Sequence, residues 1–387
     1  MLVIPPKKAY ELNMCYPIKQ FIQQTYSTNL DDYLKSVDAL NQLRNEALFK
    51  SNRQERLNKL MRYYDQLTAI ETKLPISENQ IRVPFKWQDA FEKGSIFGRG
   101  SLTLSSGLYE KLCVLFNVAS CCSDIASTSQ LDQEDGLKTA AKLYQQSAGY
   151  YSFIRDNSLS ATRSDCTLDF YPDALSLFIA TMLAQAQEIF YIKAVKDKFK
   201  DATTAKIAAQ CSDNYAEAMK SVQSESLKDV LKSWLPILAG KQALFHALSE
   251  YHRGAGDMIE QKIGEALSRF TKSLELIKKA ESRGGKEINI KSYVNKIQEA
   301  FDKAKKDNEF VYHERVPDYK TLGPIDRAPL AKVIPIKFPI SDDFRDLFST
   351  LVPITVHNGL QEFKAKRQET LNLEIGKLRQ STELINT

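Results

Sequence analysis

Apolar and polar positions follow a helical period through residues 181–210. This stretch contains no Gly and no Pro, and Ala, Gln, Lys and Glu dominate it, which favours helix. Its apolar residues recur at three- and four-residue steps but cover more than one narrow stripe, so we expect neighbouring helices on both flanks. The Lys-Asp run at 196–201 indicates a turn, and 203–220 has the pattern of a returning helix. The pattern therefore predicts a helical hairpin with Phe190 near the midpoint of this stretch.

The first hundred residues mix helical and extended patterns. Periodic apolar positions predict three helices, near 18–26, 32–49 and 54–70. Residues 73–107 are richer in Pro and Gly and carry alternating runs at 81–85 and 101–104, which predict two or three short strands. We expect the apolar run 2–4 to be an edge strand and the GRG motif within 97–100 to form a hairpin turn. One small sheet at one end of a helical body would follow.

From Gly107 onward the pattern is helical for about 200 residues. Helices are expected over 108–127, 135–154, from 172 into the central hairpin, and over 230–252, 259–280 and 294–307. A loop is expected over 157–171. We also predict a break at Gly254 and Gly256, and a helix end at Gly284 and Gly285.

Three of these segments combine small residues with one aromatic residue, at Tyr144, Tyr215 and Phe270. Tetratricopeptide helices pack in this way, because a small residue on one helix admits a ring from the next. The spacing here is irregular and longer than the usual ~34 residues. The sequence predicts a mostly α fold, a degenerate tetratricopeptide-like helical solenoid with a small β-sheet. An ordinary helical bundle is the alternative.

Residues 308–353 hold six of the thirteen prolines. Proline excludes helix over most of this segment, and a disordered linker would be poorer in apolar residues. We therefore expect an extended strap that lies along the solenoid and buries its apolar side chains, which are Val311, Leu322, Ile325, Leu330, Val333, Ile334, Ile336 and Phe338. Residues 359–387 have the pattern of a polar amphipathic helix. It ends without a stop signal, so we expect a piece of something longer.

Composition argues against several classes of function. The 53 basic and 48 acidic side chains leave a net charge of +5, too small an excess to indicate nucleic-acid binding, although it allows loose attraction to an anionic membrane. No apolar run reaches the roughly 18 residues of a membrane span, and the start does not resemble a signal peptide. The six cysteines have no CxxC spacing and suggest reduced thiols of a cytosolic protein. Because nucleotide-binding, nucleophile and metalloprotease motifs are missing, we predict a non-enzyme without cofactor or metal.

Five separated runs carry a resemblance to a known family. In order, the chain resembles the BRO domain of Alix-like, ESCRT-associated adaptor proteins from about Tyr16 to Val352. Beyond that point it resembles the first helix of the V-shaped coiled-coil domain of these adaptors. The resemblance implies two domains, a BRO domain over 1–355 with the strap at 308–353, and the start of a V-type helical domain over 356–387. The five runs are RYYDQL (62–67), PISENQIRVPFKWQDAFEKGSIFG (75–98), LYEKLCVLFNVA (108–119), MLAQAQEIFYIKAVKDK (182–198) and KKDNEFVYHERVPD (305–318).

The resemblance also implies a shape and a function. The shape is a curved, banana-like solenoid. The function is that of a non-enzymatic adaptor, cytoplasmic and recruited to endosomes, which binds the C-terminal amphipathic helix of an ESCRT-III subunit in a concave groove. These subunits are the Snf-seven-like charged multivesicular body proteins. Multivesicular body sorting, virus budding, abscission and membrane repair are the processes that follow.

Site residues come from the same resemblance. The aromatic residue of the groove falls on Phe190, and its companions on the returning helix fall on Thr203 and Ile207, where the family has a branched aliphatic residue in place of Thr203. An acidic pair near the groove falls on Glu134 and Asp135. The regulatory tyrosine, a substrate of Src-type kinases, falls on Tyr312.

Plainer interpretations of these residues remain open. Phe190 and Ile207 fit core positions, Glu134 and Asp135 are favourable charges at a helix N-terminus, and Tyr312 fits a buried ring of the strap. Lysines at 193, 196, 198, 200 and 206 outnumber Asp197 and Asp201 and fit either a solvated face or a surface for an acidic partner or anionic lipid. The competing functions are a peripheral membrane protein with a curved basic face, an enzyme with an unrecognised Cys or His, and a dimerisation module.

Overall fold

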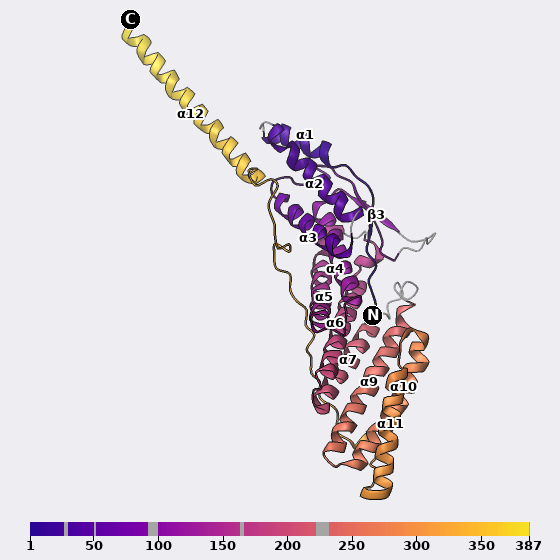
Figure 1. The fold of residues 1–387 in the computed structure, drawn as a ribbon. Helices are drawn as coiled ribbons and strands as arrows, with labels where there is room; N and C mark the ends of the chain where they lie inside the picture. The colour runs from indigo at the N-terminus through magenta and orange to yellow at the C-terminus, as the bar shows by residue number, and fades with distance from the viewer. Residues whose placement is uncertain (27–29, 50–51, 92–99, 163–165, 222–231, 387) are drawn as a thin grey trace.

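The computed structural model describes residues 1–387 except 27–29, 50–51, 92–99, 163–165, 222–231 and 387. In the described part, helices lie side by side and form an elongated stack, and one long C-terminal helix projects away from its upper end (Figure 1). A small sheet accompanies the N-terminal helices. The predicted class, mostly α with a small β-sheet, is confirmed.

Each long helix of the stack packs mainly against its neighbours in sequence. One flank therefore faces the preceding helix and the other faces the following helix, so one apolar core runs through most of the stack. The helices are α1 (Cys15–Tyr26), α2 (Asp31–Phe49), α3 (Arg53–Ile70), α4 (Gly107–Ser127), α5 (Glu134–Thr162), α6 (Pro172–Lys196), α7 (Asp201–Ser221), α9 (Trp234–Ile259), α10 (Ile263–Gly284), α11 (Lys291–Asp307) and α12 (Ile354–Asn386).

Helix α6 lies between α5 and α7, as its apolar pattern predicted. Most of its side chains are buried. By length and composition α6 would also suffice to cross a membrane, but two thirds of that stretch is covered by the rest of the molecule. Its hydrophobicity is thus accounted for by neighbours on both flanks.

The sheet is antiparallel, with the order β1 (Lys8–Ala9), β2 (Phe85–Gln88), β3 (Ser101–Leu104). The predicted strand at 101–104 is confirmed, whereas the edge strand expected at 2–4 is wrong. Those residues lie among helices, where Gln185 of α6 accepts a hydrogen bond from the Leu2 amide and Ser123 of α4 accepts one from the Ile4 amide. Helix side chains therefore replace a strand partner. Three of the four residues of the hairpin turn predicted at 97–100 lie outside the described residues, so this prediction is not tested.

Two predicted helix boundaries are also wrong. Gly254 and Gly256 lie inside α9. Gly254 serves packing, since its missing side chain makes room for Phe270 of α10. A Cβ at Gly254 would lie 2.9 Å from that ring. The loop expected from 157 begins later, since α5 continues to Thr162. The helix end predicted at Gly284 and Gly285 is confirmed.

The three aromatic residues that suggested a solenoid are core residues. Tyr144, Tyr215 and Phe270 are each at most 1% exposed, and they sit on α5, α7 and α10. The Tyr215 ring stacks on Phe245 of α9 with the centroids 5.9 Å apart. Rings of this kind join successive helices, as the tetratricopeptide comparison predicted.

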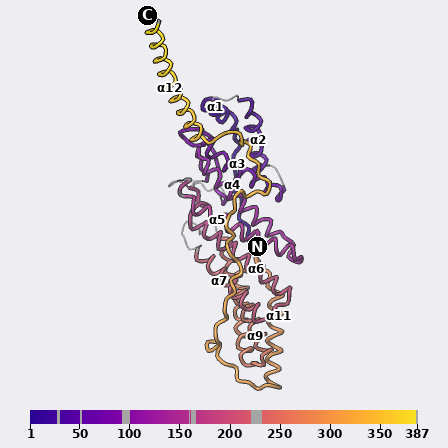
Figure 2. The backbone as a smooth tube through the Cα atoms, turned by 90° about the vertical axis from the view of Figure 1, so that its left-hand side faces the viewer, coloured from indigo at the N-terminus to yellow at the C-terminus, as the bar shows by residue number. Residues whose placement is uncertain are grey.

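The segment after α11 is the predicted extended strap, which runs back along the helical stack towards α12 (Figure 2). Its predicted mode of attachment is wrong for most of the apolar side chains. Of the eight, only Ile325 is buried, while Val311 is 66% and Phe338 52% exposed. Hydrogen bonds hold the backbone instead. For example, Ala328 N–H donates to the Lys206 carbonyl at 3.2 Å.

Candidate functional site

The helical hairpin α6–α7 carries the predicted groove residues. Helix α6 starts with Pro172 in its first turn and ends where Lys198 adopts a left-handed backbone (φ +53°). The Phe199 amide then donates to the Ala194 carbonyl at 2.9 Å, which closes the turn, and α7 begins at Asp201. The turn predicted at 196–201 is confirmed.

Buried Gln187 joins the two helices one turn before Phe190. Its side-chain amide donates to the Ile207 carbonyl at 3.3 Å. This bond brings the Phe190 turn of α6 beside the Ile207 turn of α7. Phe190 itself is partly buried and packs against the main core, so part of its ring reaches the surface.

The two predicted companions on α7 differ in exposure. Thr203 and Ile207 are four residues apart and lie on one side of the helix. Thr203 is exposed, whereas Ile207 is only 2% exposed. Ile207 therefore belongs to the core, so its interpretation as a core position is correct, whereas Thr203 lies at the surface.

The predicted acidic pair lies in the first turn of α5. Glu134 contacts Lys138 at 2.8 Å and lies 4.0 Å from Lys193, which is one turn beyond Phe190 on α6. A hydrogen bond from Lys138 lowers the pKa of this exposed carboxyl group. The structure thus brings Glu134 close to the Phe190 surface. Asp135 is exposed next to it, and both residues also match favourable charges at a helix N-terminus.

Two of the five lysines around the hairpin are neutralised by acids. Lys193 pairs with Asp197 at 2.7 Å, and Lys206 pairs with Asp326 of the strap at 2.8 Å. In the described part of the chain, the ammonium groups of Lys198 and Lys200 have no carboxylate within salt-bridge distance. The positive charge that the sequence suggested is therefore concentrated in the turn.

Tyr312 lies far along the stack, in a single π-helical turn (Asn308–Tyr312) after α11. Its side chain is 43% exposed, so the interpretation as a buried ring of the strap is wrong. The neighbouring Phe310 is 73% exposed, and His313 ends the turn with a left-handed backbone (φ +54°). Tyr312 is accessible, and it is a separate site from the Phe190 surface.

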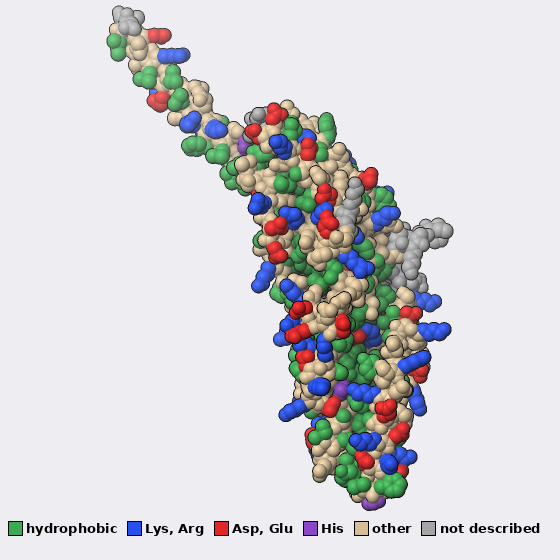
Figure 3. All heavy atoms as spheres, viewed as in Figure 1, with side chains coloured by type: hydrophobic (Ala, Val, Ile, Leu, Met, Phe, Trp, Pro, Cys, Tyr) green, Lys and Arg blue, Asp and Glu red, His purple; other side chains and the backbone are tan. Residues whose placement is uncertain are grey.

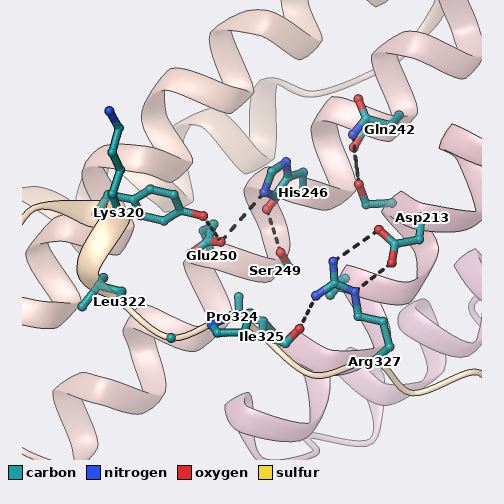
Figure 4. Close-up of a pocket in the computed structure, with 14 residues that line it drawn as sticks. Asp213, Gln242, His246, Ser249, Glu250, Lys320, Leu322, Pro324, Ile325 and Arg327 are labelled. Atoms are coloured by element: carbon teal, nitrogen blue, oxygen red, sulfur yellow. Dashed lines mark hydrogen bonds and ion pairs between the residues drawn. The ribbon is translucent and has the colours of Figure 1, made fainter.

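Sequence reasoning missed a polar cavity of about 390 Å³ between α7, α9 and the strap (Figure 4). Buried Glu250 accepts a hydrogen bond from Tyr319 of the strap at 2.7 Å, and it forms an ion pair with Arg269 at 2.9 Å. Arg327 of the strap pairs with Asp213 at 2.8 Å. These pairs compensate charges within the cavity wall, and the contacts of Tyr319 and Arg327 tie the strap to α9 and α7. A Glu and a Tyr far apart in sequence give no periodic signal that could have predicted this pairing.

Gln187 was also missed, although a signal for it exists. The run AQAQE places two amides inside an otherwise apolar helix. Buried amides need partners, so such residues indicate a segment that crosses the helix. Among the described residues, no group of three His, Cys, Asp or Glu could hold a metal ion.

Comparison with known proteins identifies the family. The model of the BRO1-like domain matches residues 1–371. The chain belongs to the BRO1-like domain family. It is 43% identical over 387 residues to the programmed cell death 6-interacting protein of Mus musculus, covering 98% of this chain and 44% of that protein. The chain thus spans less than half the length of this relative.

Two solved structures resemble this BRO1-like domain closely. The first is an ALIX BRO1 CHMP4C complex, with a TM-score of 0.86, 42% identity, and coverage of 90% of this chain and 99% of that chain. The second is ALIX in complex with the SIVmac239 PYKEVTEDL late domain, with a TM-score of 0.91, 40% identity, and coverage of 100% and 56%. The likeness confirms the predicted curved helical fold, and the family assignment confirms the resemblance drawn from the five sequence runs.

Proposed function

We propose that this BRO1-like domain is a non-enzymatic adaptor that binds the C-terminal amphipathic helix of an ESCRT-III subunit of the charged multivesicular body class. The observation that carries the proposal is the partly exposed Phe190 ring on α6, beside the Ile207 turn of α7 and one turn from Lys193. The structural relative in complex with CHMP4C supports this choice of partner. The processes served would be multivesicular body sorting, virus budding, abscission and membrane repair, with the protein cytoplasmic and recruited to endosomes.

The proposed mode of recognition is a helix in a groove. The Phe190 ring is the apolar anchor, and Thr203 flanks it on α7 while buried Ile207 supports the floor. Glu134 and Lys193 supply charges of opposite sign at one edge. Burying one anchor of this size contributes roughly 1.5–3 kcal/mol, so a few such contacts, less the cost of association, predict micromolar affinity.

The first prediction concerns Phe190. Phe190→Asp places a charge at the anchor, so the affinity for a fluorescent peptide carrying the ESCRT-III C-terminal helix should fall by at least about a hundredfold. Fluorescence anisotropy titration measures it. Phe199→Asp is the matched control, because Phe199 is a 49% exposed residue on the turn after the same helix.

Equal affinities of the two folded variants would reject Phe190 as the anchor. A thermal melt must accompany both titrations, because Phe190 also contacts the core. No binding by the folded wild type would reject the proposed partner itself.

Two further parts of the proposal concern other regions. Tyr312 is proposed as a substrate of a Src-type kinase, supported by its exposure at the surface. Helix α12 is proposed to begin a V-type helical domain, supported by its projection away from the stack with its apolar side chains exposed (Figure 1).

A further inference from the structure

One buried histidine connects both helices of the hairpin to a third helix. Nδ1 of His252 on α9 lies 2.7 Å from the carboxylate of Asp201 in the first turn of α7. Its Nε2 lies 3.1 Å from the hydroxyl oxygen of Tyr191 on α6. Figure 3 shows charged side chains spread over the outer surface of the stack, whereas His252 and Tyr191 are only 5% and 3% exposed. We call these two contacts of His252 the His252 clamp.

The clamp lies beside the proposed peptide surface. Tyr191 directly follows Phe190, and Asp201 comes two residues before Thr203. Successive residues of a helix point about 100° apart, so Phe190 reaches the surface while Tyr191 turns into the core. His252 therefore holds the two stretches of backbone that carry the apolar anchor and its neighbour on α7.

The two contacts fix the form of the imidazole ring. A carboxylate only accepts hydrogen bonds, so Nδ1 carries a proton and donates it to Asp201. Nε2 of the neutral ring is then an acceptor, and the Tyr191 hydroxyl donates to it. A protonated ring would carry N–H groups on both sides, and the Tyr191 hydroxyl would lose its acceptor. Only the neutral ring therefore makes both bonds of the clamp.

The surroundings of His252 oppose a positive charge on the ring. Burial lowers the pKa of His252, although the hydrogen bond with Asp201 acts to raise it. Lys296 of α11 acts in the same direction as burial, and its ammonium group lies 5.0 Å from the ring of Tyr251, which packs 5.0 Å from the imidazole. A loosened hairpin that admits water would take up a proton with the ordinary pKa of about 6.5. The clamp is therefore fully favoured above that pH and weakens as pH falls below it.

We propose that His252 is a positioning residue for the proposed peptide surface and that only its neutral form holds α6 and α7 on α9. This inference rests on the proposed function and adds acid sensitivity to it. Acid releases the start of α7, and the apparent affinity for the partner helix falls by the fraction of molecules in which the hairpin is held. Farther along α7 the Ser212 hydroxyl donates to the Gln242 carbonyl of α9 at 3.0 Å, a bond that does not depend on an ionisable group.

Peptide affinity at two pH values tests the positioning role. Fluorescence anisotropy titration with the ESCRT-III helix peptide should give at least about threefold weaker binding at pH 5.8 than at pH 7.5, the value of one hydrogen bond. His252→Asn keeps a donor for Asp201 and does not titrate, so its affinity should be the same at both pH values. Tyr191→Phe keeps the ring but removes the hydroxyl, so it should already bind about threefold more weakly than the wild type at pH 7.5.

The matched control is His246→Asn, which makes the same exchange six residues earlier on α9. His246 lines the polar cavity between α7, α9 and the strap and makes neither contact of the clamp. This variant should therefore keep the wild-type affinity at pH 7.5 and the wild-type loss at pH 5.8.

Amide hydrogen exchange tests the clamp without any peptide. The amides of Thr203 and Thr204 donate to the Lys200 carbonyl at 2.9 and 3.0 Å, so they report on the start of α7. After correction for the intrinsic effect of pH, their exchange should be faster at pH 5.8 than at pH 7.5 in the wild type and unchanged in His252→Asn. A folded wild type that binds no peptide at either pH would reject the proposed function, and exchange would still decide whether the clamp responds to acid.

Three results would overturn the inference. Exchange at Thr203 and Thr204 in the wild type is independent of pH, His252→Asn keeps the full acid loss of peptide affinity, or His246→Asn abolishes that loss as His252→Asn does. Thermal melts at both pH values verify that each variant is folded. If His252→Asn does not fold, Tyr191→Phe decides instead, and wild-type affinity in this variant at pH 7.5 would reject the clamp as a positioning device.

Discussion

At the scale of single residues, Thr203 is the position where this chain departs from the family pattern. Its side chain is exposed on α7, on the side of Ile207. If a partner helix covers this position, Thr203→Val exchanges a hydroxyl group for a methyl group and should tighten peptide binding by about threefold to fourfold, the value of one buried carbon. Fluorescence anisotropy titration measures the change.

A second substitution at position 203 makes the opposite change. Thr203→Ser removes the methyl group and should weaken binding slightly, while Thr370→Val on the projecting α12 should leave the affinity unchanged. An affinity that is identical for Val, Thr and Ser at position 203 would place this residue outside the contact surface.

Residue roles could be predicted from the sequence only in part. The helical hairpin and its turn follow from periodicity, and the family resemblance selects Phe190. Periodicity could not distinguish Phe190 from Ile207, because both lie on apolar stripes. Ile207 is 2% exposed and Phe190 is only partly buried, and this difference follows from the packing of the whole stack and not from the local pattern.

At the scale of elements, Gln187 is one of the buried side chains that hold the strap. Its oxygen accepts hydrogen bonds from the amides of Leu330 and Ala331 at 3.1 and 3.0 Å. Its amide donates to the Ala328 carbonyl at 2.9 Å and to the Ile207 carbonyl. One fully buried side chain thus satisfies strap and α7 backbone groups together.

Gln187→Leu keeps a similar volume but removes the hydrogen-bond partner of the strap groups at Ala328, Leu330 and Ala331, whereas the Ile207 carbonyl keeps its place in the ladder of α7. We expect a loss of about 2–5 kcal/mol in the free energy of unfolding, since each orphaned buried group costs about 1–3 kcal/mol. Urea denaturation measures it, and amide hydrogen exchange should accelerate at Leu330 and Ala331. Gln145→Leu is the comparison, because it removes one strap bond, to Lys332, and keeps the backbone bond to Ile334.

A loss for Gln187→Leu no larger than that for Gln145→Leu would contradict this account. The strap also shows what sequence reasoning missed at this scale. Proline content predicted an extended segment correctly, but apolar content predicted burial that only Ile325 shows. Many contacts that hold the strap join its backbone to glutamine, aspartate and lysine side chains, and backbone groups leave no signature in the sequence.

At the scale of the whole molecule, the strap joins the two ends of the stack. It follows α11 at the lower end and reaches α12 at the upper end (Figures 1 and 2). The angle between successive helices sets this shape, and a pattern of apolar positions along one chain does not encode that angle directly.

A buried charge cluster connects three segments that lie far apart in the sequence. Lys7, just before β1, pairs with Asp169 of the α5–α6 connection at 2.6 Å, and both side chains are 0% exposed. Asp89, just after β2, accepts hydrogen bonds from the amides of Asp169 at 3.1 Å and Phe91 at 2.8 Å. Burial, and then the negative charge of Asp169, raise the pKa of Asp89 to about 6.

The raised pKa makes global stability depend on pH. The folded state holds the Asp89 proton more tightly than the unfolded chain, whose aspartates titrate near pH 4. The stabilisation from this group is therefore complete below pH 4 and is lost as pH rises through about 6. The free energy of unfolding of the wild type, relative to Asp89→Asn, should fall by about 2 kcal/mol between pH 4.5 and 7.5.

Urea denaturation of both proteins at the two pH values measures this difference, and taking the difference cancels groups that titrate alike in both. Asp156→Asn, an exposed aspartate on α5, serves as control and should show no such trend. A difference that is constant with pH would mean that Asp89 is ionised throughout this range. Lys7 would then compensate two carboxylates at once, and Lys7→Met should destabilise the domain more at pH 7.5 than at pH 4.5.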